Sequence, residues 1–218
     1  MKYPVSFDLE LRKNPYPGRL ITIEGIDGAG KTTQAKELVK RLNKNGGNAA
    51  YTKEPTDLVI GQFIREKILS GNLQMHPVAL QYLFNADRVM HMEKIETFLK
   101  KGLTVVMDRY FWSAVAYAIA DVGGDLDQYL TAFSILSSYH QFIVPDETFY
   151  LDITADKALE RIQASGKHTE IYDNKEKLPK IVHAYTLLMK KFPDQFTIIA
   201  ADKTPEKVTD EIVDLLKK

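Results

Sequence analysis

The stretch Gly25-Ile26-Asp27-Gly28-Ala29-Gly30-Lys31-Thr32 decides which fold we expect for this chain. It has the spacing G-x-x-x-x-G-K-T, follows the apolar run 20–24 and precedes an amphipathic helical pattern that ends near Gly46. In this setting the glycines let backbone N–H groups converge on phosphate oxygens, and the helix N-terminus adds positive charge. The stretch therefore predicts a loop that binds a nucleoside triphosphate. The simpler alternative is a glycine turn between a strand and a helix, which the full motif in context disfavours.

The residues of this loop have separate expected roles. Lys31 supplies a full positive charge at the phosphates, and the hydroxyl of Thr32 is expected to lie on Mg²⁺, the expected cofactor. We expect contacts with ATP from Gly25, Ile26, Asp27, Gly28, Ala29, Gly30, Lys31, Thr32 and Thr33.

The loop does not specify a reaction, and three classes of protein compete. A GTPase switch would need an Asn-Lys-x-Asp base reader after a strand, whereas Asn43-Lys44 ends the first helical pattern and lacks the Asp. A mechanical or transport ATPase would need interaction domains for which 218 residues leave no room. Phosphoryl transfer to a small acceptor is the class that remains.

Composition predicts one globular domain and excludes several other functions. Lys plus Arg and Asp plus Glu number 29 each, so the chain lacks the broad basic field of a nucleic-acid binder, and no nucleic acid is expected as partner. The absence of cysteine excludes a disulfide scaffold, a thiolate metal site and a thiol nucleophile. Neither a secretory signal nor a membrane-spanning run is recognisable, so we expect no membrane association and a cytoplasmic location.

Hydrophobic periodicity predicts an α/β fold, because short strand-like runs alternate with longer helical patterns. We expect a parallel sheet of about five strands, flanked by helices on both faces. The strand candidates are residues 20–24, 48–52, 103–107, 148–152 and 196–200. A long helix is expected over 77–101, and a final helix after Thr204 as N-cap. The polar, glycine-containing stretch 165–176 between two helical patterns predicts a mobile lid.

A second candidate site, Asp108-Arg109-Tyr110, directly follows the apolar run 103–107. It therefore lies at the carboxyl end of a strand, where parallel sheets place their ligands. Asp108 could hold Mg²⁺ through water or orient the acceptor, and Arg109 offers a bidentate fork to phosphate. A surface Asp-Arg pair is the alternative, which the nearby phosphate loop makes the weaker one.

Three motifs in order resemble those of the thymidylate kinases. They are residues 24–34 around the loop, Leu83-Phe84-Asn85-Ala86-Asp87-Arg88, and the stretch 108–117 with the pattern D-R-Y-x-x-S-x-x-A-Y. The resemblance runs from about Arg19 to the C-terminus, which leaves residues 1–18 as an N-terminal extension. It implies a P-loop kinase fold in one domain, 19–218, that acts as a homodimer and catalyses ATP + dTMP → ADP + dTDP.

The resemblance also implies roles at the acceptor. Phe84 would stack on the thymine ring and Arg88 would hydrogen-bond its edge. Arg109 would bind the acceptor phosphate, Asp27 would face the sugar 3′-hydroxyl, and Tyr117 would occupy the space of a ribose 2′-hydroxyl. For Phe84 and Tyr117, a place in the hydrophobic core is the alternative.

Further roles follow from the same resemblance. Lys53 stands where the family often has an Arg on the acceptor phosphate, and Tyr172 of the lid would help to hold the acceptor. Ser113 would share the acceptor-facing side of its helix with Tyr117. Ala201 and Asp202 would lie along the adenine of ATP.

The chain departs from the family at the catalytic arginine, which members usually carry in the loop or the lid. Here the loop has Gly28, and residues 164–174 contain no Arg. Three outcomes stay open: Lys167 substitutes, Arg161 reaches in, or the enzyme is slow. Catalysis is otherwise expected from Lys31 and Arg109, with Asp27 and Asp108 at the site.

Two other functions stay open on the sequence alone. The nearer is a kinase for another nucleotide or a nucleoside, with dUMP as an example. The more distant is a nucleotide-binding regulatory module that hydrolyses ATP slowly.

Overall fold

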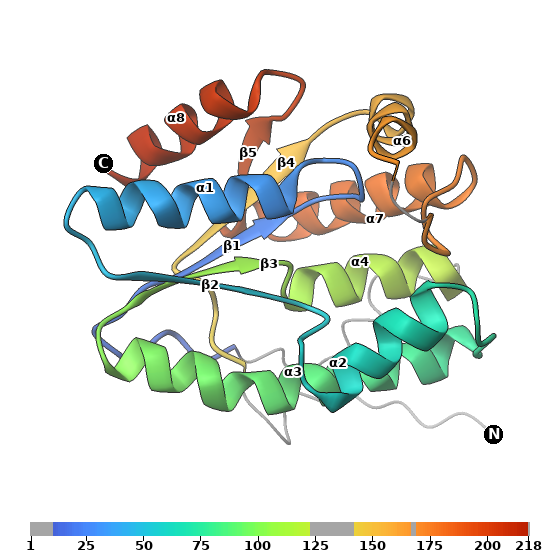
Figure 1. Ribbon diagram of the computed structural model, residues 1–218, viewed down its shortest axis with the longest axis horizontal. Coiled ribbons are helices and arrows are strands. Elements are labelled where there is room, and N and C mark those ends of the chain that lie inside the picture. The colour runs from blue at the N-terminus through green and yellow to red at the C-terminus, as the bar shows by residue number, and fades with distance from the viewer. Residues whose placement is uncertain (1–10, 123–141, 167–168, 218) are drawn as a thin grey trace.

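The computed structural model describes residues 11–122, 142–166 and 169–217. Its centre is a fully parallel sheet in the order β2-β3-β1-β4-β5, with helices on both sides (Figure 1). The strands are β1 Leu20–Glu24, β2 Ala49–Lys53, β3 Thr104–Asp108, β4 Glu147–Asp152 and β5 Thr197–Ala200. The predicted fold is confirmed, and every predicted strand boundary lies within one residue of the observed one.

The central strand β1 directs the first motif to the functional edge of the sheet. All five of its residues are buried, as expected for a parallel strand covered on both faces. Its neighbours are β3 on one side and β4 on the other. The strand order therefore reverses beside β1, and the loop after Glu24 lies at this switch point, where open α/β sheets bind ligands.

The helices form two layers. In the first, α1 (Lys31–Lys44) packs against α8 (Pro205–Leu216) on one face of the sheet. In the second, α3 (Pro77–Lys100), α4 (Phe111–Val122) and α7 (Lys177–Lys191) pack together on the other face. The remaining described helical segments are α2 Val59–Phe63, the π-helix η1 Ile64–Leu69, α6 Ala155–Ala164 and the short 3₁₀ turn η2 Pro193–Gln195.

Local sequence explains where the long helices begin and end. The side chain of His76 accepts a hydrogen bond from the N–H of Val78 at the start of α3, where Pro77 takes the first helical position. Gly102, with φ 77°, follows its C-terminus. Thr204 takes the predicted N-cap position of α8, although its side chain makes no capping hydrogen bond.

Residues 11–18, which belong to the predicted N-terminal extension, pack against the rest of the described chain. Arg12 pairs with Ile143 in an isolated parallel bridge, and its guanidinium forms an ion pair with Glu96 of α3. The hydroxyl of Tyr16 donates to the same carboxylate at 2.8 Å. In the described ranges, no helix has the length and apolar character needed to cross a bilayer.

Candidate active site

A cavity of about 590 Å³ opens at the carboxyl edge of the sheet and brings together residues far apart in the sequence. Its volume is in the range of small-molecule sites. The residues predicted from sequence that line it are Asp27, Gly28, Ala29, Gly30, Lys31, Thr32, Thr33, Lys53, Phe84, Arg88, Asp108, Arg109, Ser113, Tyr117, Tyr172 and Ala201.

Three predicted contacts of ATP are not part of this lining. The carbonyl of Gly25 accepts from Arg109 at 3.3 Å, and the carbonyl of Ile26 accepts from Lys31 Nζ at 2.6 Å. Gly25 and Ile26 therefore contact the side chains of Arg109 and Lys31 without lining the cavity themselves. Asp202 instead forms an exposed ion pair with Lys157 at 3.3 Å.

The backbone of the phosphate loop depends on glycine at two positions. Gly30, at the N-terminus of α1, has φ 96°, in the left-handed region that only glycine adopts readily. Gly28 has φ 80°, and a Cβ there would lie 2.3 Å from the carbonyl oxygen of Ala158 in α6. A side chain at Gly28 would therefore collide with the backbone of α6 as it lies in this structure.

Arg109 is the centre of the polar contacts beside the loop. Its guanidinium forms an ion pair with Asp27 and donates to the hydroxyl of Tyr117 at 2.9 Å and to Ser113 Oγ at 3.2 Å. The Tyr117 hydroxyl donates in turn to Asp27 at 2.8 Å. Helix α4 places Ser113 and Tyr117 one turn apart, and both contact Arg109.

The charges in this cluster perturb each other. Burial opposes ionisation of Asp27, but the Arg109 guanidinium and the Lys31 ammonium together hold the pKa of Asp27 well below its ordinary value. Burial, with Arg109 nearby, lowers the pKa of Lys31, which lies 3.6 Å from the Asp27 carboxylate. Asp27 therefore stays ionised.

The backbone of Arg109 is strained. Its φ of 71° is in the left-handed region, which is uncommon for residues other than glycine. Such a conformation costs about 1–3 kcal/mol and persists where the surroundings fix it, often at functional sites. Here the N–H of Arg109 donates to the carbonyl of Ile23 in β1 at 3.1 Å.

The buried carboxylate of Glu24, which the sequence did not predict as part of the site, contacts this cluster. Glu24, the last residue of β1, accepts from the N–H of Tyr110 at 2.9 Å, from the hydroxyl of Tyr185 at 2.8 Å and from Ser113. Burial raises the pKa of Glu24 despite these donors. Its one sequence signal is an acidic residue at the end of an otherwise apolar strand.

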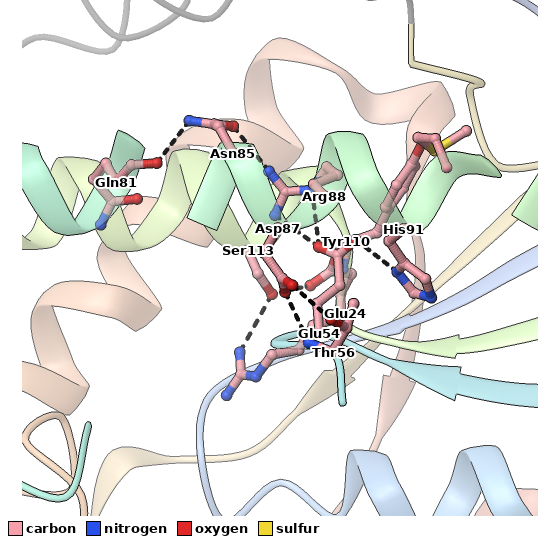
Figure 2. A network of polar contacts seen from close by, with 12 residues as sticks. Glu24, Glu54, Thr56, Gln81, Asn85, Asp87, Arg88, His91, Tyr110 and Ser113 are labelled. Atoms are coloured by element: carbon pink, nitrogen blue, oxygen red, sulfur yellow. Dashed lines mark hydrogen bonds and ion pairs between the residues drawn. The ribbon is translucent and has the colours of Figure 1, made fainter. Parts of the chain in front are cut away.

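At the far end of the cavity, α3 contributes Phe84 and Arg88. Arg88 Nε and Nη2 each lie 2.8 Å from the Glu54 carboxylate, and Nη1 donates to Asn85 Oδ1 at 3.0 Å (Figure 2). The guanidinium lies over the rings of Tyr110 and Phe142, 5.9 and 5.8 Å from their centroids. Phe84 and this fixed cation both line the cavity, a combination suited to recognition of a planar ring.

Comparison with known proteins identifies the family. The family model described as thymidylate kinase matches residues 23–212. The chain belongs to the thymidylate kinase family. This confirms the resemblance and the predicted class of enzyme, an ATP-using phosphotransferase that converts dTMP to dTDP.

Individual relatives agree with this assignment. The chain is 36% identical to a probable thymidylate kinase of Thermococcus onnurineus, over 90% of this chain and 96% of the relative. It is 32% identical to a thymidylate kinase of Exiguobacterium sp., over 90% and 93%. A solved thymidylate kinase structure from Candida albicans superposes with a TM-score of 0.75 at 27% identity, over 92% of this chain and 91% of that one.

The segment that the sequence predicts as a lid lies close to the cavity. Its described residues, 165–166 and 169–176, connect α6 to α7. The N–H of Ile171 donates to the carbonyl of Leu69 at 3.1 Å. Tyr172 is buried, stands edge-on to Tyr117 with ring centroids 4.8 Å apart, and donates to Asp121 at 2.6 Å.

Other cations also line the cavity. Arg161 of α6 is one of them, and it donates to the carbonyl of Ala201 at 2.8 Å. Lys167, the other predicted substitute for the catalytic arginine, lies outside the described residues. Arg65 of η1, which sequence reasoning missed, is a further lining cation and pairs with Asp57 at 2.7 Å. No periodic pattern marked the segment that carries Arg65, so it had no sequence signal.

Proposed function

We propose that the chain performs this reaction across one cavity, with the ATP phosphates on the loop and the dTMP base against α3. One observation carries the proposal. The phosphate loop lines one part of the cavity, Phe84 and Arg88 line another, and Arg109 lines it as well. A donor and an acceptor held there share one cavity, and such positioning supplies a large part of phosphoryl-transfer catalysis.

The base subsite favours a pyrimidine with a carbonyl at its edge. An arginine has five N–H donors and no acceptor. Three of the five in Arg88 face Glu54 and Asn85, which leaves two for a ligand. An oxygen at position 4 of thymine accepts from such donors, whereas the amino group of cytosine does not.

At the phosphates, Lys31 and Arg109 act through charge. Lys31 neutralises charge that develops on the transferred phosphoryl group, and Arg109 holds the acceptor phosphate with Lys53 beside it. The γ-phosphorus–oxygen bond of ATP breaks as a bond forms to an oxygen of the dTMP phosphate, and ADP leaves. The acceptor oxygen is already anionic at neutral pH, so no general base is required.

The oxygen ligands beside the loop fit Mg²⁺. Thr32 Oγ1 donates to the Asp108 carboxylate, so a hydroxyl and a carboxylate stand together at the loop. Among the described residues no three His, Cys, Asp or Glu side chains cluster as a complete metal site. Mg²⁺ is usually held by one or two carboxylates plus substrate phosphates, so this partial set suits it. When bound, it would offset charge on the β- and γ-phosphates.

For the sugar, Asp27 and Tyr117 are the proposed contacts. Asp27 faces the 3′-hydroxyl as an ionised acceptor, and the Tyr117 ring leaves no space for a 2′-hydroxyl. Their mutual hydrogen bond of 2.8 Å supports a joint role.

We assign the missing catalytic arginine to Arg161, because its side chain lines the cavity. The lid, residues 165–176, closes over the phosphates in this proposal, and its polar composition and its place between α6 and α7 support that. Ala201, which also lines the cavity, and Asp202 border the adenine.

A homodimer is supported by an exposed apolar stripe on α3. Val78, Tyr82 and Val89 lie at i, i+4 and i+11, on one side of the helix, and all three are exposed. On the adjacent α2, Val59 is 71% exposed. We place the enzyme in the cytoplasm, where its nucleotide substrates occur.

The experiment is an assay of the purified chain with Mg-ATP and a panel of monophosphates: dTMP, dUMP, dCMP, dAMP and TMP with ribose. We expect dTMP to be the best acceptor and dCMP to be rejected. Preference for dUMP would move the assignment to the related kinase. ATP hydrolysis without phosphorylation of any acceptor would contradict the proposal.

A further inference from the structure

The cation of the base subsite belongs to a longer chain of buried polar side chains. Glu54 uses one carboxylate oxygen, Oε2, for Arg88, and its other oxygen, Oε1, lies 3.1 Å from Nδ1 of His91. The opposite ring nitrogen, Nε2, lies 2.7 Å from the hydroxyl of Thr52 in β2. Figure 2 shows Arg88 and His91 reaching from α3 to the same carboxylate.

The carboxylate partner fixes the direction of the hydrogen bond at Nδ1 of His91. An ionised carboxylate only accepts, so Nδ1 of His91 carries a proton and donates to Glu54. In the neutral ring Nε2 is then an acceptor, and the hydroxyl of Thr52 donates to it. The Thr52 hydroxyl, both ring nitrogens of His91 and both carboxylate oxygens of Glu54 thus have hydrogen-bond partners. His91 itself is only 1% exposed.

The His91 ring is held by hydrogen bonds at both of its nitrogens. A second cavity of about 170 Å³, whose lining includes His91, Thr52 and Lys94, lies beside this chain. The hydrogen bonds to Thr52 and Glu54 determine the orientation of the ring. Loss of the His91 donor would leave Glu54 Oε1 buried without a partner, which is costly.

We propose that His91, held by Thr52, is a positioning residue for base recognition. It fixes the carboxylate of Glu54, and Glu54 orients Arg88 so that its two remaining N–H donors face the base. This inference rests on the proposed function, in which Arg88 binds the edge of thymine.

The test compares dTMP with an analogue that lacks the 4-oxygen and carries N3 as an acceptor, the deoxynucleotide of 5-methyl-2-pyrimidinone. His91→Leu removes the donor, whereas His91→Asn keeps an N–H near the position of Nδ1. We expect His91→Leu to raise KM for dTMP roughly tenfold, with kcat and KM for ATP nearly unchanged, as for one lost charged hydrogen bond. His91→Asn should recover most of this loss. The analogue should lose much less, because it lacks the 4-oxygen that Arg88 is proposed to bind.

Thr148→Val is the matched control. It removes a buried hydroxyl contact, at 3.1 Å from Thr22, between β1 and β4. We expect a lower Tm with an unchanged preference between dTMP and the analogue. Thr52→Val should lower the preference for dTMP in the same direction as His91→Leu, by a few fold.

Equal losses with dTMP and with the analogue, or a loss confined to kcat, would overturn the proposal and leave His91 a merely structural residue. If His91→Leu fails to fold, His91→Asn and Thr52→Val still test the proposal. An unchanged preference for dTMP over the analogue in Thr52→Val would contradict the proposed link from Thr52 through His91 to Arg88. Failure of the wild-type protein to phosphorylate dTMP would instead refute the proposed function itself.

Discussion

The two ends of the cavity hold their cations in different ways. At the base end, Arg88 and Glu54 are a buried pair, with side chains 3% and 5% exposed, and Glu54 is itself held by His91. At the phosphate end, Arg109 and Lys31 share Asp27, whose side chain is 26% exposed. A neutral ring needs directed donors with no net charge, whereas phosphates need charge. At the base end, Glu54 therefore compensates the charge of Arg88 within the protein. At the phosphate end, two cations share the one Asp27 carboxylate, and a ligand phosphate can replace it as their partner.

This comparison predicts that removing a phosphate-end cation lowers the rate most. Lys31→Ala should reduce kcat by about a thousandfold while the fold stays intact, because Lys31 neutralises charge in the transition state. Steady-state kinetics with circular dichroism as the control for folding will measure this. Near-normal turnover would remove the assignment of the phosphate loop.

The next largest effect is expected at the acceptor phosphate. Arg109→Ala should lower kcat/KM for dTMP about a hundredfold and change KM for ATP little, because its proposed ligand is the acceptor. Arg109→Lys should recover part of this loss, since it keeps the charge without the fork. Equal losses of ATP and dTMP binding would show that Arg109 serves the donor subsite.

Between the two ends, Tyr117 should affect the choice of sugar. Tyr117→Ala is expected to narrow the ratio of kcat/KM between dTMP and its ribose counterpart by about tenfold, by admitting the ribonucleotide. Tyr117→Phe keeps the ring but removes the contacts to Asp27 and Arg109. It should keep the ratio while slowing both substrates. A proportional loss for both sugars in Tyr117→Ala would assign the discrimination to another residue.

The smallest expected effect is a dependence of stability on pH with opposite signs at two carboxylates. Burial raises the pKa of Glu24, so its stabilising protonation is present at low pH and lost as pH rises from the ordinary value of 4.5. Glu24→Gln cannot ionise at this position, so its Tm should increase relative to that of wild type as the pH rises above 4.5. The pKa of Asp27 is lowered, so its contribution is present above 3.8 and lost as pH falls below it.

Melting curves of wild type, Glu24→Gln and Asp27→Asn over a range of pH would test these signs. A constant difference in Tm between Glu24→Gln and wild type would contradict the raised pKa.

The sequence predicted the fold well, because each strand is a short apolar run bounded by polar or glycine-rich residues. It also predicted most of the cavity lining, since the phosphate loop and the Asp108-Arg109 motif directly follow strands whose carboxyl ends meet at one edge of the sheet. The contacts of Glu24 could not be predicted, because Ser113 and Tyr185 are 89 and 161 residues away in the chain. For the same reason, the close approach of α6 to Gly28 could not be predicted.

The order of the strands constrains how this chain can fold. β1 and β2 are consecutive in sequence but do not pair with each other, and both pair with β3. A ribosome that builds the chain from its N-terminus must therefore deliver residues up to Asp108 before two strands of the sheet can join. Until then, the apolar strand β1 is synthesised but has no partner strand. The same central position that directs the phosphate loop to the site thus delays the first step of sheet assembly.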